Sequence, residues 1–82
     1  MRHPITEQNF RPLTSVLESG YTVSIELGDL VQDKQVWRDQ AMRVTVVNNS
    51  GETTWEMFRG SNATLNAKKW LEKTTDGAVR SF

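Results

Sequence analysis

Residues 21–27 show the clearest pattern in the chain, a strict alternation of apolar and polar side chains. The apolar positions are Tyr21, Val23, Ile25 and Leu27, and the polar ones are Thr22, Ser24 and Glu26. Successive side chains of a strand point to opposite faces of the sheet, so a strand with one buried face shows this alternation. The segment therefore predicts a half-buried β-strand.

Residues 41–48 and 53–59 predict two further strands that form an antiparallel hairpin. The first is rich in β-branched residues, and the second alternates apolar with polar or charged side chains. The intervening Asn48-Asn49-Ser50-Gly51 consists of residues that favour turns and tolerate a positive φ. The sequence therefore predicts a tight connection between neighbouring strands.

The hairpin also predicts which side chains face the core. In the first strand we expect these to be Met42, Val44 and Val46. In the second strand we expect Trp55 and Met57 to face the core. Phe58 and Val47 then lie on the opposite face of the sheet.

Two segments show helical spacing. In residues 9–20, Asn9 can cap the helix, Pro12 falls in the first turn and Gly20 can end it. The apolar positions of this segment are Phe10, Leu13, Val16 and Leu17. In residues 63–73, one apolar stripe is formed by Ala63, Ala67, Trp70 and Leu71, with Leu65 nearly opposite. Asn62 is the expected cap of this second helix.

These elements predict an α+β fold in the order helix, three-stranded antiparallel meander, helix, with both helices on one face of the sheet. Residues 28–40 are polar and irregular apart from Leu30, Val31, Val36 and Trp37, and we expect a loop there, with the start of the next strand near Val36 as an option. We expect a flexible lead-in over residues 1–8, a single domain over 9–74 and a flexible tail over 75–82.

Composition narrows the class of protein. The chain has 82 residues, of which 37% are apolar and 24% charged, values typical of a small globular domain. It contains no cysteine, which excludes disulfides and thiolate metal sites. No apolar run is long enough for a membrane span or a signal peptide, and we expect a cytoplasmic protein. Ten basic and ten acidic residues balance, which disfavours a protein that depends on phosphate contacts.

The residues that usually carry catalysis lack partners in this sequence. His3 is the single histidine, so Ser15 and Ser24 have no expected base, and zinc lacks ligands. Glu26 and Glu56 fall on the sheet face expected to be wet. We therefore expect no enzyme, no metal and no cofactor.

A binding role remains, and the sequence offers two surfaces for it. An apolar and basic patch on the open sheet face predicts a protein partner, or a second copy of the chain. Its residues are Arg43, Val47, Phe58 and Arg59, with Trp37 at the edge. The alternative is a nucleic-acid site formed by Arg59, Lys68, Lys69 and Lys73. Salt dependence separates the two, because phosphate binding weakens steeply as salt rises.

Two resemblances bear on function. The expected order of elements resembles the double-stranded-RNA-binding domain, although residues 61–68 hold no lysine before Lys68, whereas that family begins its second helix with lysines. Met42-Arg43-Val44-Thr45-Val46-Val47, a Ser-Gly-Glu turn and Thr54-Trp55-Glu56-Met57-Phe58 resemble the YkfF-like proteins of prophages and plasmids. A meander followed by a tryptophan-bearing helix is also similar to small phage inhibitors of host defence, including anti-CRISPR proteins. These resemblances imply a mobile-element origin and a host-modulating binding role.

Overall fold

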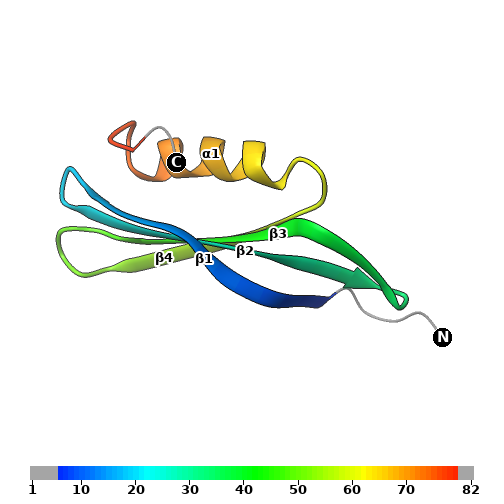
Figure 1. Ribbon diagram of the computed structural model, residues 1–82. Helices are drawn as coiled ribbons and strands as arrows, with labels where there is room; N and C mark the ends of the chain where they lie inside the picture. Colours follow the sequence, from blue (N-terminus) through cyan, green and yellow to red (C-terminus); the bar gives the residue numbers. More distant parts are fainter. Residues whose placement is uncertain (1–5, 80–82) are drawn as a thin grey trace.

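A four-stranded antiparallel sheet and one helix make up the fold (Figure 1). The computed structural model describes residues 6–79. The strands follow one another as neighbours in the sheet, in the order β1, β2, β3, β4. Their bounds are β1 Thr6–Glu18, β2 Tyr21–Gln32, β3 Gln35–Val47 and β4 Thr53–Arg59, and the helix that follows is α1 Ala63–Thr74.

The expected order of helix, three strands and helix is wrong, because residues 9–18 belong to β1 and not to a helix. β1 is an edge strand, and an edge strand tolerates Pro12, which cannot donate a ladder hydrogen bond. The register with β2 shifts between Gln8 and Arg11 and again between Pro12 and Thr14. Each shift resets the alternation of side chains, so the apolar residues of this strand fall at spacings that imitate a helix.

The segment 28–40, expected to be a loop, forms the end of β2 and the start of β3. The two strands are joined at Asp33 and Lys34, which both have a positive φ, of 50° and 68°. Such a two-residue connection matches the twist of the strands, but it usually carries glycine at its second position. Because Lys34 stands where glycine is usual, the sequence does not indicate this turn.

The hairpin of β3 and β4 is confirmed. β3 ends at Val47, β4 begins at Thr53, and Val47 pairs with Thr53. The side chain of Asn48 holds the turn, because its Oδ1 accepts the backbone N–H groups of Ser50 at 2.9 Å and of Glu52 at 3.0 Å. Gly51 has a φ of 82°, as the turn requires.

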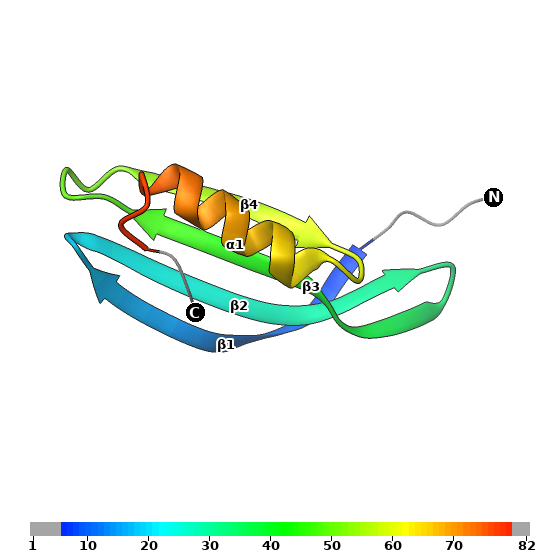
Figure 2. The same cartoon turned by 90° about the horizontal axis from the view of Figure 1, so that it is seen from above.

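The helix over residues 63–74 is also confirmed, and it packs on β3 and β4 (Figure 2). Its stripe buries Ala63, Ala67 and Leu71, while Trp70 is half-buried and Leu65 is exposed. Asn62 stands at the N-cap, but its side chain makes no capping hydrogen bond. Packing against the sheet, and not capping, therefore stabilises this helix.

The core lies between α1 and the sheet. Its strand residues are Val23, Ile25, Met42, Val44 and Val46, all with at most 2% of their surface exposed. Their facing partners on the helix are Ala63, Ala67 and Leu71. Because two alanines face the sheet, the helix can approach it closely, and the larger side chains of the strands fill the layer between them.

The packed structure extends beyond the expected domain bounds of 9 and 74. Thr6–Gln8 belong to β1, and Val79 joins the core with 1% of its surface exposed. Thr75 brings this segment back to the sheet, because its hydroxyl donates to the Leu71 carbonyl at 2.8 Å and accepts the Val79 N–H at 3.1 Å. The remaining parts of the expected lead-in and tail, residues 1–5 and 80–82, lie outside the described residues.

Candidate interaction surface

The sheet face opposite α1 carries side chains from all four strands, and we call it the open face. The register of the sheet sets its membership, because the residues that pair with one another across strands share a face. Its polar members are Ser15, Thr22, Ser24, Glu26, Arg43, Thr45, Thr53 and Arg59. Its apolar members are Leu17, Val47, Trp55 and Met57.

Two apolar side chains of the open face are strongly exposed. Leu17 on β1 exposes 75% of its surface, and Trp55 on β4 exposes 60%. Val47, which pairs with Thr53, is a diagonal neighbour of Trp55, and both Val47 and Met57 are half-buried. The side of the open face over β3 and β4 therefore carries an apolar patch of Val47, Trp55 and Met57.

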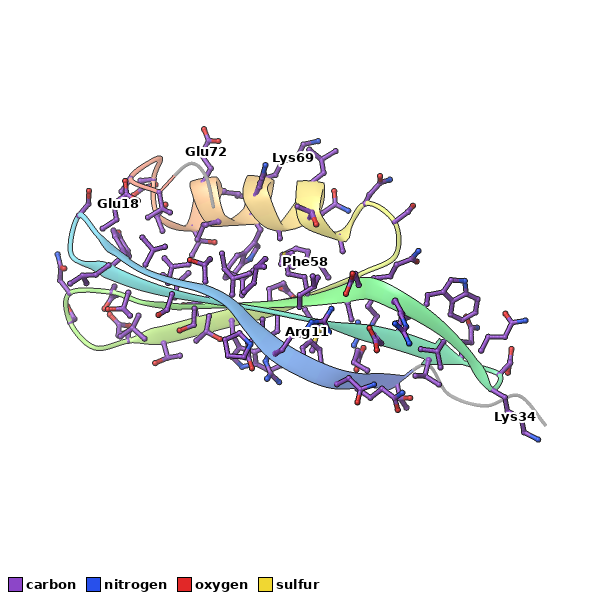
Figure 3. All side chains as sticks on the ribbon, viewed as in Figure 1. Arg11, Glu18, Lys34, Phe58, Lys69 and Glu72 are labelled. Carbon is purple, nitrogen blue, oxygen red and sulfur yellow. The ribbon has the colours of Figure 1, made fainter. Side chains whose placement is uncertain are left out.

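The expectation that Trp55 and Met57 face the core, with Phe58 on the open face, is wrong. Phe58 pairs with Met42, whose side chain is buried beneath α1, so Phe58 points to the helix. Its ring lies 5.9 Å from that of Trp70, edge to face at 65°, and Figure 3 shows it between sheet and helix. Alternation in β4 fits either phase, and pairing with β3 decides between them. Trp55, with 60% of its surface exposed, is therefore a surface residue that the sequence pattern does not reveal.

Arg43 lies on the open face as expected, but it is not a free cation. Its Nε donates to Glu26 Oε1 at 2.8 Å, and its guanidinium carbon lies 4.7 Å from the centre of the Phe10 ring. The hydrogen bond from Arg43 lowers the pKa of Glu26, and the same bond raises the pKa of Arg43. Phe10 also lies over Gly28, where an added Cβ would come within 2.8 Å of the ring. Phe10 therefore closes this end of the open face.

The structure separates the remaining residues of the expected protein-binding patch. Arg59 shares the face of Arg43 by register, and it forms an ion pair with Glu7 of β1. Trp37 is half-buried, opposite Leu30 in the part of β3 nearest the β2–β3 turn. Only Val47 and Arg43 lie close to the exposed Trp55 on the open face.

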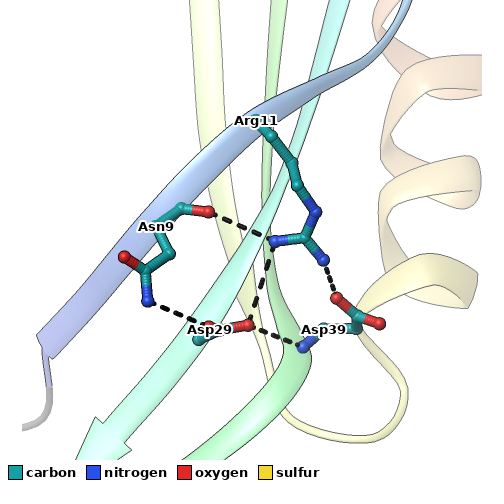
Figure 4. Close-up of polar contacts among 4 residues, drawn as sticks. All are labelled: Asn9, Arg11, Asp29 and Asp39. Atoms are coloured by element: carbon teal, nitrogen blue, oxygen red, sulfur yellow. Dashed lines mark hydrogen bonds and ion pairs between the residues drawn. The ribbon is translucent and has the colours of Figure 1, made fainter.

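A polar cluster lies where the sheet bends (Figure 4). The Asp29 carboxylate accepts the side-chain N–H of Asn9 and the backbone N–H of Asp39, both at 3.1 Å. Arg11 donates to the Asn9 carbonyl at 3.2 Å and pairs with Asp39. Asn9 and Asp39 have a φ of 59° and 62°, so both strands bulge beside Asp29. We call this cluster of Asn9, Arg11, Asp29 and Asp39 the bend cluster.

The bend cluster lowers the pKa of Asp29. The largest cause is the hydrogen bond from the Asn9 side chain, followed by the one from the Asp39 backbone; Arg11 adds a smaller attraction. These donors satisfy the carboxylate of a residue that exposes only 7% of its surface. No group of three or more histidine, cysteine, aspartate or glutamate side chains within residues 6–79 could hold a metal ion. Through its hydrogen bonds to Asn9 and Asp39, Asp29 joins the bulges of β1 and β3.

The residues of the alternative nucleic-acid site do not come together. Lys68, Lys69 and Lys73 are exposed on α1, and Figure 3 shows Lys69 and Glu72 on the side of the helix away from the sheet. Lys69, Lys73, Glu72 and Gly77 line a shallow, open hollow. Arg59 lies on the opposite face of the sheet and pairs with Glu7. The lysines therefore form a short strip beside a carboxylate, without the arginine.

Comparison with known proteins adds no assignment. No protein-family model matches the chain, and neither a curated protein nor a solved structure matches it. Within residues 6–79, no helix is long and apolar enough to cross a membrane.

Proposed function

We propose that this chain is a small, non-catalytic binding protein that associates stoichiometrically with another protein through its open face. The observation that carries the proposal is Trp55, which exposes 60% of its surface beside Val47 and Met57. Exposing a large aromatic side chain to water is unfavourable, and tryptophan is the residue most enriched among those that dominate binding energy. A partner that covers this patch removes the exposed apolar surface of Trp55 from water.

The charges of the open face favour a protein over a nucleic acid. Glu26 neutralises Arg43, and Glu7 neutralises Arg59, so the face presents no excess of positive charge. Beside the apolar patch lie the hydroxyl groups of Ser15, Ser24 and Thr45, which pair in register across the sheet, and Thr45 pairs with Trp55. An apolar centre with a neutral polar surround is the composition of a protein–protein interface.

The biological setting belongs to the same proposal. A chain of this size that acts by binding, with the resemblance to mobile-element proteins, fits a role in the bacterial cytoplasm in which it blocks a host protein, such as a component of a defence system. Blocking requires only that the open face cover a surface of that protein. No catalytic group is needed for this action.

Affinity capture from a nuclease-treated bacterial lysate tests the proposal. The wild type is compared with Leu17→Ser and Trp55→Ser, which remove the exposed apolar side chains of the open face. Leu65→Ser is the matched control, because Leu65 exposes 51% of its surface but lies on α1. We expect one protein, recovered in a fixed ratio with the wild type and with the control, and recovery at least about tenfold lower with Trp55→Ser, a loss of about 1.4 kcal/mol or more.

Three results would count against the proposal. Equal recovery with all variants would move the binding surface away from the open face. Loss of recovery after nuclease treatment alone would favour the lysines of α1 and a nucleic-acid partner. Weaker recovery with Leu65→Ser, but not with the open-face variants, would place the protein partner on the helix.

A further inference from the structure

The two edges of the sheet differ in how well they are protected against pairing with another strand. β1 contains Pro12 and two register shifts, features that prevent regular pairing along an edge. β4 pairs with β3 without interruption from Thr53 to Arg59, and it contains no proline, glycine or lysine. In the part of the chain that the structure describes, no strand lies on the outer side of β4. An unprotected edge of this kind is a site for strand pairing.

The hydrogen bonds at the two ends of β4 show which backbone groups point outward. The Gly60 N–H donates to the Gln40 carbonyl at 2.8 Å, and the Asn48 N–H donates to the Glu52 carbonyl at 3.0 Å. In an antiparallel ladder such bonded pairs alternate with non-bonded pairs. The intervening bonded residues of β4 are therefore Thr54, Glu56 and Phe58. The residues with N–H and C=O groups that face away from β3 are Thr53, Trp55, Met57 and Arg59.

The Met57 N–H illustrates this arrangement. It points away from β3, and its contact is the Oε1 of the neighbouring Glu56, at 3.4 Å. That distance is beyond the usual range for an amide donor, and the Glu56 side chain is exposed. A strand placed beside β4 would offer a carbonyl at a normal distance instead.

We propose that the occupant of this edge is β4 of a second copy of the chain, paired antiparallel about a two-fold axis perpendicular to the sheet. The four strands of each copy then form one continuous sheet, and both α1 helices lie on the same face of it. The open faces of the two copies join, with the two Trp55 side chains near the axis. This interface is formed by the backbone of β4, and the Trp55 side chain lies beside it on the open face.

The charges of β4 indicate the register. With Met57 opposite Met57 of the second copy, Trp55 lies opposite Arg59 and Glu56 opposite Phe58. This pairing places a guanidinium beside an indole ring, an attractive contact, and brings no like charges together. Shifting the register to place Trp55 opposite Met57 would bring the two Glu56 carboxylates face to face, which is unfavourable.

The charges of β4 also favour a closed dimer. β4 carries one acidic and one basic residue, Glu56 and Arg59, so it is neutral, and antiparallel pairing in this register brings no like charges together. The dimer contact uses the outer edge of β4 in each copy. The β1 edges that remain are interrupted by register shifts and cannot add further chains. Assembly therefore stops at two copies.

Sedimentation equilibrium of the wild type, Met57→Pro and Met57→Ala tests the dimer. Proline at position 57 removes an N–H that faces away from β3, so the ladder with β3 keeps its hydrogen bonds. Alanine keeps the N–H and removes the same side chain. We expect a mass twice the 9.4 kDa of the chain for the wild type and for Met57→Ala at high concentration. Met57→Pro is expected to sediment at 9.4 kDa.

Amide hydrogen exchange of the wild type provides a second test that needs no folded variant. The Trp55 and Met57 amides should exchange more slowly as the protein concentration rises, whereas exposed loop amides, such as that of Asn49, should not change. A wild type that stays at 9.4 kDa at high concentration would overturn the proposal. So would a dimer in which the Trp55 and Met57 amides remain unprotected, or in which Met57→Pro folds and dimerises as the wild type does. None of these readouts depends on whether a partner protein is captured.

Discussion

At the scale of single residues, Asp29 links the bulges of two strands. Its carboxylate receives one hydrogen bond from the side chain of Asn9 in β1 and one from the backbone of Asp39 in β3. Asparagine and aspartate tolerate the positive φ that both bulges require. The bend therefore depends on residue types that sequence analysis usually associates with loops.

The lowered pKa of Asp29 predicts a pH-dependent stability. Folding favours the ionised carboxylate, so its contribution is fully present above the ordinary pKa of 3.8 and disappears as pH falls through the lower folded-state value. We expect Asp29→Asn to lower the thermal unfolding midpoint by several degrees at pH 7. The difference from the wild type should shrink as the pH is lowered below 3.8, because asparagine resembles the protonated acid.

Thermal unfolding of both proteins between pH 7 and the acid limit of folding measures this difference. Glu26→Gln is the necessary companion, since the pKa of Glu26 is also lowered and it titrates in the same acid range. A gap between wild type and Asp29→Asn that stays constant through this range would show that the carboxylate charge does not stabilise the bend.

At the scale of elements, α1 depends on the sheet. It has no acidic residue in its first turn and no side-chain cap, and one lysine, Lys73, lies in its last turn. Twelve residues are also close to the lower limit for an isolated helix. Its stability therefore comes from the buried stripe that ends in Leu71, which has no exposed surface.

Two leucines of α1 provide a matched test of this dependence. Leu71→Ala removes a fully buried side chain and leaves a cavity, which should lower the free energy of unfolding by about 2–5 kcal/mol. Leu65→Ala removes a side chain with 51% of its surface exposed and should change it by about 0.5 kcal/mol or less. Urea unfolding followed by circular dichroism gives both values. Similar losses for the two variants would mean that α1 packs differently.

At the scale of the whole molecule, the helix protects only part of the sheet. The molecule measures 45 Å along its longest axis, but α1 lies over β3 and β4, and the β2–β3 turn extends beyond it (Figure 1). Val36, beside that turn, exposes 50% of its surface, whereas Ile25 and Val44 expose none. The fold therefore has a two-layer region under the helix and a single-layer extension beyond the bend.

This asymmetry predicts two levels of local stability. Amides that pair β2 with β3 within residues 30–37 should exchange with solvent faster than those within 23–27 and 42–46, because opening the extension exposes little apolar surface. Amide exchange followed by NMR at neutral pH measures both sets in one sample. Uniform protection along the two strands would instead indicate that the sheet opens as one unit.

Much of the fold could be read from the sequence where local pattern and tertiary environment agree. β2 is recognisable from its alternation because Val23 and Ile25 on one face are buried in the core, whereas the other face of the strand is open. The β3–β4 turn appears because Asn48 and Gly51 meet its backbone requirements directly. The stripe of α1 appears because Ala63, Ala67 and Leu71 lie on the single face that contacts the sheet.

The candidate surface could be predicted only in part. Arg43 and Val47 lie on the open face as expected, but the alternation of β4 predicts the exposed Trp55 in the core and Phe58 on the surface. In β4, apolar residues occupy both phases of the alternation, and local sequence does not say which phase meets the helix. The pairing of Phe58 with Met42 makes that choice.

The sequence by itself determined the segments whose pattern matches one periodicity: residues 21–27 of β2, the hairpin of residues 41–47 with β4, and the helix α1. Only the tertiary structure decides that residues 6–18 form the strand β1, and which face of β4 meets the helix. In β1 the register shifts around Asn9 and Pro12 interrupt the alternation, and its few buried contacts leave no continuous stripe. A strand whose periodicity is broken, or whose two faces are similarly apolar, acquires its identity only from the strand beside it.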